Sequence, residues 1–388
     1  MISLEKIAVI VQGPVVPPGK PDQYATCDTL KSARHLLPGA QIILSTWENS
    51  DVTGLDFDTL VTSQDPGSFP IMDLRACNIN RQITSTREGL RKANRPYAVK
   101  LRSDCLLENL GFLNYWEQFP DRSPDCQIFA RRIAACACYF RNPAKREKAY
   151  LFHPSDIFQF GLTTDLLDLW DIPLANKNVC VPPARPIPFL YQYEPCWYNK
   201  VEEQYGWLEC LNKHGVKADL KYAWEFSLKL ANLSELSMAN NFVVMSMKDC
   251  GVKLPSKISR YSQELVYKHE EWLGIYHLFC SQRRTPIGKW LRDAQLLQTH
   301  FHSILNHLYH VGRHYLVRAL LKLKDIFGIP TRNKPKGYPL PFAPAVVYFK
   351  GVKFPMPCHL NDNYEYPEWI LSDKTRRPYD DAQSWWVV

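Results

Sequence analysis

Three short apolar segments near the start of the chain are each followed at once by polar residues: Gln12-Gly13-Pro14, Ser45-Thr46-Trp47 and Arg102-Ser103-Asp104. If the segments are parallel strands, these residues meet at one edge of a sheet, where open α/β sheets bind ligands. Asp104 offers the oxygen ligand that a hard divalent cation prefers, and nucleotide phosphates would share that cation. Lys100 and Arg102 flank it and suit a diphosphate. The alternative is that Asp104 caps a following helix.

Two other acidic residues have the types and positions expected of a general base. Asp156 lies in the segment His153–Gly161, where its carboxylate could bind sugar hydroxyls or accept a proton beside an aromatic ring. Glu203 starts an expected helix and could deprotonate a hydroxyl. Turn formation, capping and favourable acid placement in a first helical turn are the alternatives. Asn80 and Arg81 open another expected helix, where they either bind phosphate or ribose or serve as a cap and a surface cation.

The segments that carry these residues predict an α/β domain with a mainly parallel sheet. Continuous β-branched or apolar runs predict buried strands, and apolar residues spaced by three or four predict helices. The expected strands are 6–11, 41–45, 59–62, 97–101 and 240–247, and the expected helices include 27–36, 78–93 and 202–212.

The composition is that of a globular protein. The chain has 388 residues, of which 46% are hydrophobic and 22% charged, which excludes a disordered chain, a collagen-like chain and a coiled-coil rod. The 12 cysteines include no Cys-x-x-Cys pair, so we expect buried thiols in a reducing compartment. The first residues lack the basic start and long apolar run of a signal peptide, so we expect a cytoplasmic protein.

Most of the net charge of +8 lies in one segment, because Arg283 to Lys324 holds eight basic residues and one acid. Its apolar residues recur near a period of 3.6, which predicts one long amphipathic helix, or two with a break at Gly312. Such a helix could lie on an anionic membrane through the apolar residues Trp290, Leu291, Leu297, Phe301 and Leu308. The alternative is that this face packs on the rest of the protein.

An ordered series of motifs resembles the WavE lipopolysaccharide synthesis family. The series is Ile-Val-Gln-Gly-Pro, Leu-Pro-Gly-Ala-Gln-Ile-Ile-Leu-Ser-Thr-Trp-Glu, Asp-Pro-Gly, Asn-Ile-Asn-Arg-Gln-Ile, Val-Lys-Leu-Arg-Ser-Asp, His-Pro-Ser-Asp-Ile-Phe-Gln-Phe-Gly and Glu-Glu-Gln-Tyr, between Lys6 and Cys250. The resemblance implies a GT-A-like glycosyltransferase. Enzymes of that fold commonly hold a metal on Asp-x-Asp; this chain has Arg-Ser-Asp there, so only Asp104 is carried over, as a ligand of Mg²⁺ or Mn²⁺.

These observations together predict a glycosyltransferase that moves a sugar from a nucleotide-sugar donor to a lipid-linked or core oligosaccharide acceptor. The expected donor site comprises Gln12, Gly13, Pro14, Trp47, Asn80, Arg81, Lys100 and Arg102, with Asp156 or Glu203 as the base. We expect a catalytic domain over 1–282, the basic helical segment over 283–328 and an irregular Pro- and Tyr-rich tail over 329–388. A peripheral position on the inner membrane follows from the basic segment.

Three other functions remain open on the sequence. A non-catalytic glycan-binding or scaffolding member of the same fold is the first of them. A nucleotidyltransferase would need a basic, Gly-rich loop near the first strand, where Lys20 is the candidate. A nucleic-acid-binding protein would use the basic helix, but its apolar residues fit that partner poorly, so we expect no nucleic acid.

Overall fold

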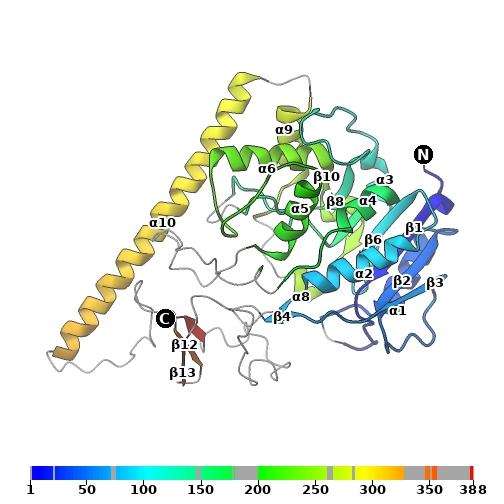
Figure 1. Ribbon diagram of the computed structural model, residues 1–388, viewed down its shortest axis with the longest axis horizontal. Helices are drawn as coiled ribbons and strands as arrows, with labels where there is room; N and C mark the ends of the chain where they lie inside the picture. Colours follow the sequence, from blue (N-terminus) through cyan, green and yellow to red (C-terminus); the bar gives the residue numbers. More distant parts are fainter. Residues whose placement is uncertain are drawn as a thin grey trace.

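The computed structural model describes residues 2–20, 22–70, 76–145, 150–176, 179, 200–259, 265–281, 285–326, 346–349, 352–355 and 385–387. A seven-stranded sheet with helices on both faces forms its centre (Figure 1). The sheet contains β1 (Ile7–Gln12), β2 (Gln41–Trp47), β3 (Thr59–Ser63), β6 (Tyr97–Arg102), β8 (Ile133–Cys136), β9 (Phe158–Leu162) and β10 (Phe242–Met245).

The strand order is β10-β8-β9-β6-β1-β2-β3, and all neighbours are parallel except that β9 is antiparallel to β6 and β8. The predicted mainly parallel α/β sheet is therefore confirmed, and its order is consistent with the GT-A-like, Rossmann-like fold that the resemblance implies. Every residue of β1 is buried, as its hydrophobic run predicted, whereas β3 at the edge of the sheet has only Val61 buried.

The helices of the described chain surround this sheet. They are α1 (Thr26–Leu36), α2 (Ile79–Arg91), α3 (Gly111–Trp116), α4 (Thr163–Trp170), α5 (Glu202–Lys213), α6 (Leu228–Asn241), α7 (Met247–Cys250), α8 (Ser256–Ser259), α9 (His269–Phe279) and α10 (Pro286–Ile326), with a 3₁₀ turn, η1 (Leu4–Lys6). The predicted helices at 27–36, 78–93 and 202–212 are confirmed as α1, α2 and α5. The predicted strand at 240–247 is shorter, because α6 continues to Asn241.

The connections place α1 and α2 on opposite faces of the sheet. Helix α1 joins β1 to its neighbour β2, whereas α2 leads from β3 back past β2 and β1 to β6. Since parallel crossovers are right-handed, connections that run in opposite directions put their helices on opposite faces. Helix α2 lies close to β1 and β2 at Gly89, where an added Cβ would come within 2.6 Å of Ile10.

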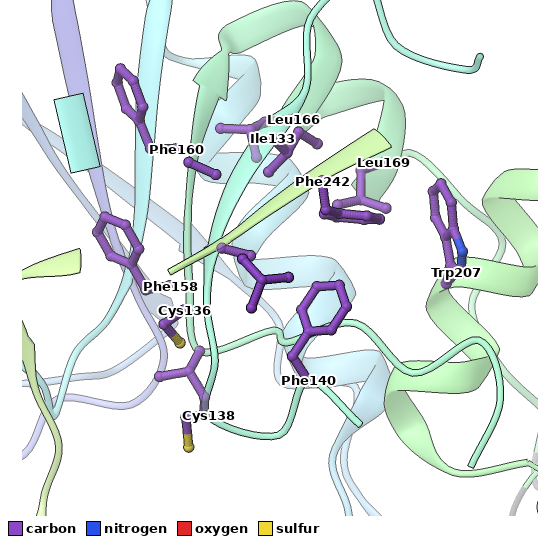
Figure 2. Packing of buried hydrophobic residues seen from close by; sticks show 14 of the residues in the cluster. Ile133, Cys136, Cys138, Phe140, Phe158, Phe160, Leu166, Leu169, Trp207 and Phe242 are labelled. Atoms are coloured by element: carbon purple, nitrogen blue, oxygen red, sulfur yellow. The ribbon is translucent and has the colours of Figure 1, made fainter. Parts of the chain in front are cut away.

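Aromatic and aliphatic side chains fill the space between the sheet and its helices. Figure 2 shows Phe158 and Phe160 of β9 on one side of this core and Phe242 of β10 near Trp207 of α5 on the other. The rings of Trp207 and Phe242 are 4.9 Å apart. The nine described cysteines are all free thiols and seven are buried, which confirms the expected thiols for this part of the chain.

Helix α10 continues from Pro286 to Ile326 without interruption, which confirms the first alternative, one long helix without a break at Gly312. A single glycine lowers helix stability by about 1 kcal/mol, which the rest of a helix of 41 residues tolerates. Of the expected tail, the structure describes three short antiparallel strands, β12 (Val346–Phe349), β13 (Val352–Pro355) and β14 (Trp385–Val387). The remainder of 329–388 lies outside the described residues, and the predicted domain boundaries stay predictions.

Two further strand pairs complete the described elements. They are β4 (Phe69–Pro70) with β5 (Ala76–Cys77), and β7 (Leu106–Leu107) with β11 (Val252–Lys253). Among the described residues, no helix combines the length and the hydropathy needed to cross a bilayer.

Candidate functional site

The candidate site lies at the carboxyl ends of β1 and β6. The connections from these adjacent strands leave in opposite directions, which makes this point the topological switch of the sheet and its expected ligand crevice. Gln12 and Arg102 are paired in register at the two strand ends. The loops that follow are tied together, because Ser103 N donates to Gln12 O at 2.9 Å and Ser103 Oγ donates to Pro14 O at 2.7 Å.

The turn after β1 requires the glycine at its centre. Gly13 has φ +120°, a backbone conformation that residues other than glycine rarely adopt. An added Cβ would also lie 3.0 Å from Ser103 Oγ. The side chain of Gln12 is buried against α2, where its Oε1 accepts a hydrogen bond of 2.7 Å from Ser85 Oγ. The predicted donor residues Gln12, Gly13 and Pro14 therefore form a rigid rim beside Arg102.

Arg102 and Asp104 form a two-pronged ion pair at this rim. Arg102 Nε and Nη2 donate to the two carboxylate oxygens of Asp104, each at 3.0 Å. The Asp104 side chain is 5% exposed and that of Arg102 is 26% exposed. Burial opposes the charge of Arg102, but the carboxylate beside it raises the Arg102 pKa above its usual value. The pair holds a guanidinium at the carboxyl end of β6, where a ligand is expected.

This arrangement does not fit a divalent cation on Asp104. Both carboxylate oxygens already accept hydrogen bonds from a cationic side chain, which would also repel a metal ion. Within the part of the chain that the structure describes, no three His, Cys, Asp or Glu side chains group as a metal site. The cation, Mg²⁺ or Mn²⁺, stays a prediction, and no step below depends on it.

Lys100 lies two residues before Arg102, so the two side chains are on the same face of β6. It is fully buried, its Nζ donates to the backbone oxygen of Asp156, and it lies 4.6 Å from the centre of the Trp170 ring. Burial lowers the pKa of Lys100 to about 8, although the charge of Asp156 opposes this change. Lys100 thus fixes the loop that carries Asp156 against β6.

The two acids that the sequence nominated as bases come together in space. Asp156, before β9, and Glu203, in the first turn of α5, line the same small cavity of about 20 Å³. Burial, and then the charge of Asp156, raise the pKa of Glu203 well above its usual value. His153 Nε2 lies 3.4 Å from Glu203 Oε2. A carboxyl that holds its proton toward neutral pH is suited to exchange protons with a substrate there.

Comparison with known proteins agrees with the resemblance in the sequence. The sequence model of the family described as WavE lipopolysaccharide synthesis matches residues 7–302. The chain belongs to the WavE lipopolysaccharide synthesis family. The match runs from β1 into α10 and so covers the whole seven-stranded sheet and every candidate site residue of this WavE protein. A comparison with proteins of curated function finds no match.

Three other predicted donor-binding residues of the WavE chain have surroundings of their own. Asn80 is buried, and its amide both donates to Ala175 O at 2.9 Å and accepts from Ala175 N at 2.7 Å. Arg81 forms a two-pronged pair with Asp65 at 2.7 and 2.6 Å. Trp47 is half-buried at the end of β2. Asn80 and Arg81 therefore fasten neighbouring loops, and their expected part in donor binding stays a prediction.

Sequence reasoning did not nominate two residues of the site, His153 and Trp170. His153 stands at the start of the motif that contains Asp156, so its position next to that acid was the available signal. Trp170 ends α4, far from Lys100 in the sequence, and no local pattern indicates that the two are in contact. Glu202, which precedes Glu203 in the sequence, accepts a hydrogen bond from Asn78 N. This bond joins the start of α5 to the start of α2.

The burial of His153 predicts that this residue lowers the stability of the protein at acidic pH. Burial, with the charge of Arg141, lowers the pKa of His153 to about 3, so the ring is neutral in the folded chain. The unfolded chain binds this proton below about pH 6.5, so stability is complete above that pH and falls as the pH drops toward 3. We expect His153 by itself to make the free energy of unfolding in urea about 2 kcal/mol lower at about pH 5 than at about pH 7, and the raised pKa of Glu203 to act in the opposite direction.

A matched pair of variants tests whether His153 causes this loss. The free energy of unfolding of His153→Gln, relative to the unaltered chain, is expected to rise by about 2 kcal/mol between about pH 7 and about pH 5, whereas the exposed His35→Gln is expected to show no such change. An unaltered pH dependence in His153→Gln would mean that another group is responsible.

Proposed function

We propose that this WavE-family chain is a glycosyltransferase that moves a sugar from a nucleotide-sugar donor to a lipopolysaccharide or other surface-polysaccharide acceptor. The observation that carries the proposal is that Asp156 and Glu203 share one cavity, and that Lys100 fixes the loop of Asp156 against β6, which ends at Arg102. An acid that exchanges protons and a guanidinium that binds phosphates are what transfer from a nucleoside diphosphate sugar requires.

The donor binds across the ends of β1 and β6 in this proposal. The rim Gln12-Gly13-Pro14 lies on one side of its diphosphate and Arg102 on the other, with Trp47 at the next strand end available to stack on a ring. The ion pair with Asp104 uses Nε and Nη2 of Arg102, so Nη1 is available to a phosphate oxygen. A fixed guanidinium stabilises the negative charge that grows on the leaving diphosphate.

The acceptor hydroxyl attacks the anomeric carbon of the donor sugar. A new carbon–oxygen bond forms to the acceptor, the bond from the anomeric carbon to the diphosphate breaks, and the hydroxyl proton passes to the carboxylate of Glu203 or Asp156. The cavity between these acids, about 20 Å³, has room for about one water and not for a sugar. The acceptor must therefore approach from the crevice side, or α5 must move away from β9.

The acceptors of this reaction are lipid-linked or core oligosaccharides, which places the chain peripherally at the cytoplasmic face of the inner membrane. Nucleic acid is not among the proposed partners. A divalent cation would supply additional stabilisation of negative charge. The Arg102–Asp104 pair supports a donor site in which the guanidinium binds the diphosphate without such a cation.

A second candidate is a non-catalytic glycan-binding or scaffolding member of the family. The observation that favours it is the same ion pair, because Arg102 occupies both oxygens of the carboxylate that the resemblance assigns to a metal. Such a protein would bind a sugar nucleotide or a glycan without turnover.

A thermal-shift and hydrolysis screen of nucleotide sugars, with and without Mn²⁺, tests the proposal. We expect one donor to raise Tm and to be hydrolysed slowly, and the Arg102→Gln/Asp104→Asn double variant, which leaves no buried charge unpaired, to lose both effects. Arg91→Gln, in an exposed ion pair on α2, is the control and should retain both. A shift without turnover would support the non-catalytic candidate, and no shift with any donor would contradict the proposed sugar transfer.

A further inference from the structure

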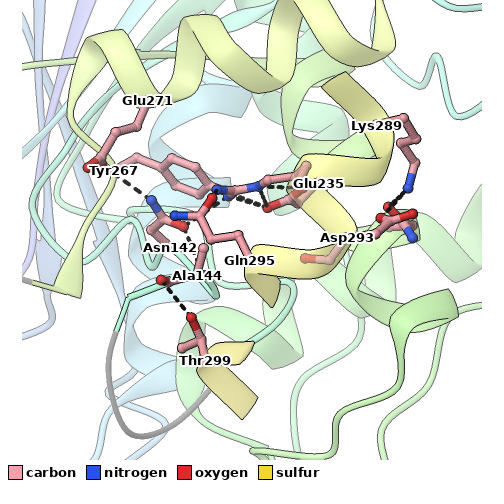
Figure 3. A network of polar contacts seen from close by, with 12 residues as sticks. Asn142, Ala144, Glu235, Tyr267, Glu271, Lys289, Asp293, Gln295 and Thr299 are labelled. Carbon is pink, nitrogen blue, oxygen red and sulfur yellow. Dashed lines mark hydrogen bonds and ion pairs between the residues drawn. The ribbon is translucent and has the colours of Figure 1, made fainter. Parts of the chain in front are cut away.

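One face of the first half of α10 is fixed to the body of the protein (Figure 3). Arg292 Nη2 donates to Glu235 Oε1 at 2.5 Å and to Asn142 Oδ1 at 3.1 Å, and Thr299 Oγ1 donates to Ala144 O at 3.0 Å. Leu296, between them on the same face, is completely buried. This docking determines which side of the helix faces outward.

The opposite face of α10 is a stripe of large exposed apolar side chains. Their exposed fractions range from 45% to 72%, and the members of this outer stripe are Ile287, Trp290, Leu291, Leu297, Phe301, Leu305 and Tyr309. Steps of three, four or their multiples keep them on one side of the helix. Counted at about 100° per residue, the stripe is centred opposite Leu296. It is about 33 Å long at a rise of about 1.5 Å per residue.

Four residues that the sequence assigned to the apolar face, Trp290, Leu291, Leu297 and Phe301, are thus exposed together, and the side chain of Leu308 is not among those described. The alternative that this face packs on the protein is wrong for the four. Exposed tryptophan, tyrosine and phenylalanine are costly in water, and the same rings are favoured at the boundary of headgroups and acyl chains.

The charge of α10 selects the kind of surface. Between Asp293 and Asp325 the helix has no acidic residue, and it contains Arg313, Arg318, Lys322 and Lys324. A basic helix with one apolar stripe complements an anionic bilayer, to which each basic residue near the surface adds about 1 kcal/mol of binding free energy. A second copy of the same helix would match the apolar stripe but would offer no negative charge to these basic residues.

We propose that α10 is a docking helix for the surface of an anionic phospholipid bilayer, into which the outer stripe inserts. The helix lies along the membrane, and Arg292 and Leu296 hold its inner face on the body of the protein, where Arg292 contacts Glu235 of α6 and Asn142. The inference uses the proposed function only for the purpose of the docking, which is to bring the donor site to lipid-linked acceptors. Its evidence is the stripe and the charge of α10.

Vesicle flotation of the full-length chain tests the inference without any sugar nucleotide. We expect the protein to float with vesicles of phosphatidylcholine and phosphatidylglycerol and to float weakly with phosphatidylcholine alone. Trp290→Glu/Phe301→Glu is expected to lower the partition coefficient at least about 10-fold, because two large apolar side chains no longer insert. Leu174→Glu/Leu60→Glu, which alters exposed leucines away from α10, is the control and should float as the unaltered chain does.

Two results would overturn the inference. One is that the unaltered chain does not float with anionic vesicles, and the other is that the Trp290→Glu/Phe301→Glu variant floats as well as the unaltered chain. If instead the unaltered chain is a dimer by light scattering and this variant is a monomer that floats equally well, the stripe binds a second copy. The variant should keep the thermal shift with a nucleotide sugar, so failure of membrane docking and failure of the proposed sugar transfer are distinguished.

Discussion

Replacing Glu203 with glutamine is expected to lower kcat of sugar transfer by about 100- to 10,000-fold, the usual contribution of a general base. Glutamine keeps the size of the side chain, so it can still contact His153. The same loss is expected from Asp156→Asn if that acid is the base, and comparison of the two variants assigns the role. The measurement is the rate of transfer at saturating donor, with Glu209→Gln on the same helix as the control.

The pH profile separates catalysis by Glu203 from a structural role. A base must be ionised to accept a proton, and burial together with Asp156 raises the Glu203 pKa. The acidic limb of the kcat profile should therefore lie above the range of an ordinary carboxyl, and it should be absent in Glu203→Gln. Undiminished transfer in Glu203→Gln, in Asp156→Asn and in the double variant would contradict catalysis by these acids.

The second large effect concerns stability. Arg292→Gln is expected to lower the free energy of unfolding by about 3–5 kcal/mol, because it leaves the carboxylate of Glu235 buried without its cation. The Glu235 side chain is 1% exposed and otherwise accepts from Tyr267 Oη at 3.0 Å. The measurement is urea denaturation, and the control Arg91→Gln, which loses only exposed partners, should cost at most about 1 kcal/mol.

A double variant shows whether the unpaired charge is the cause. Arg292→Gln/Glu235→Gln removes both charges, so it should recover part of the stability that Arg292→Gln loses. Equal stability losses in Arg292→Gln and Arg91→Gln would mean that α10 is not held by this pair.

Local patterns were sufficient to predict most elements of the sheet. Continuous runs of β-branched and other apolar residues predicted the strands β1, β2, β3 and β6. Apolar residues spaced by three or four predicted the helices α2 and α5. The mainly parallel arrangement also followed, because strands alternated with helices in the first hundred residues. The reversed direction of β9 did not follow, since strand direction depends on which strands it pairs with and not on its own residues.

The sequence by itself determined that Asp104, Asp156 and Glu203 stand at a strand end, in a loop before a strand and at a helix start, because those positions depend on local structure. Only the tertiary structure decided which side chains each acid contacts. Asp104 is paired with Arg102, and Asp156 and Glu203 share one cavity with His153 beside them. The physical reason is that the charge state of a buried acid depends on neighbours that packing brings from distant segments, and a local pattern contains no record of them.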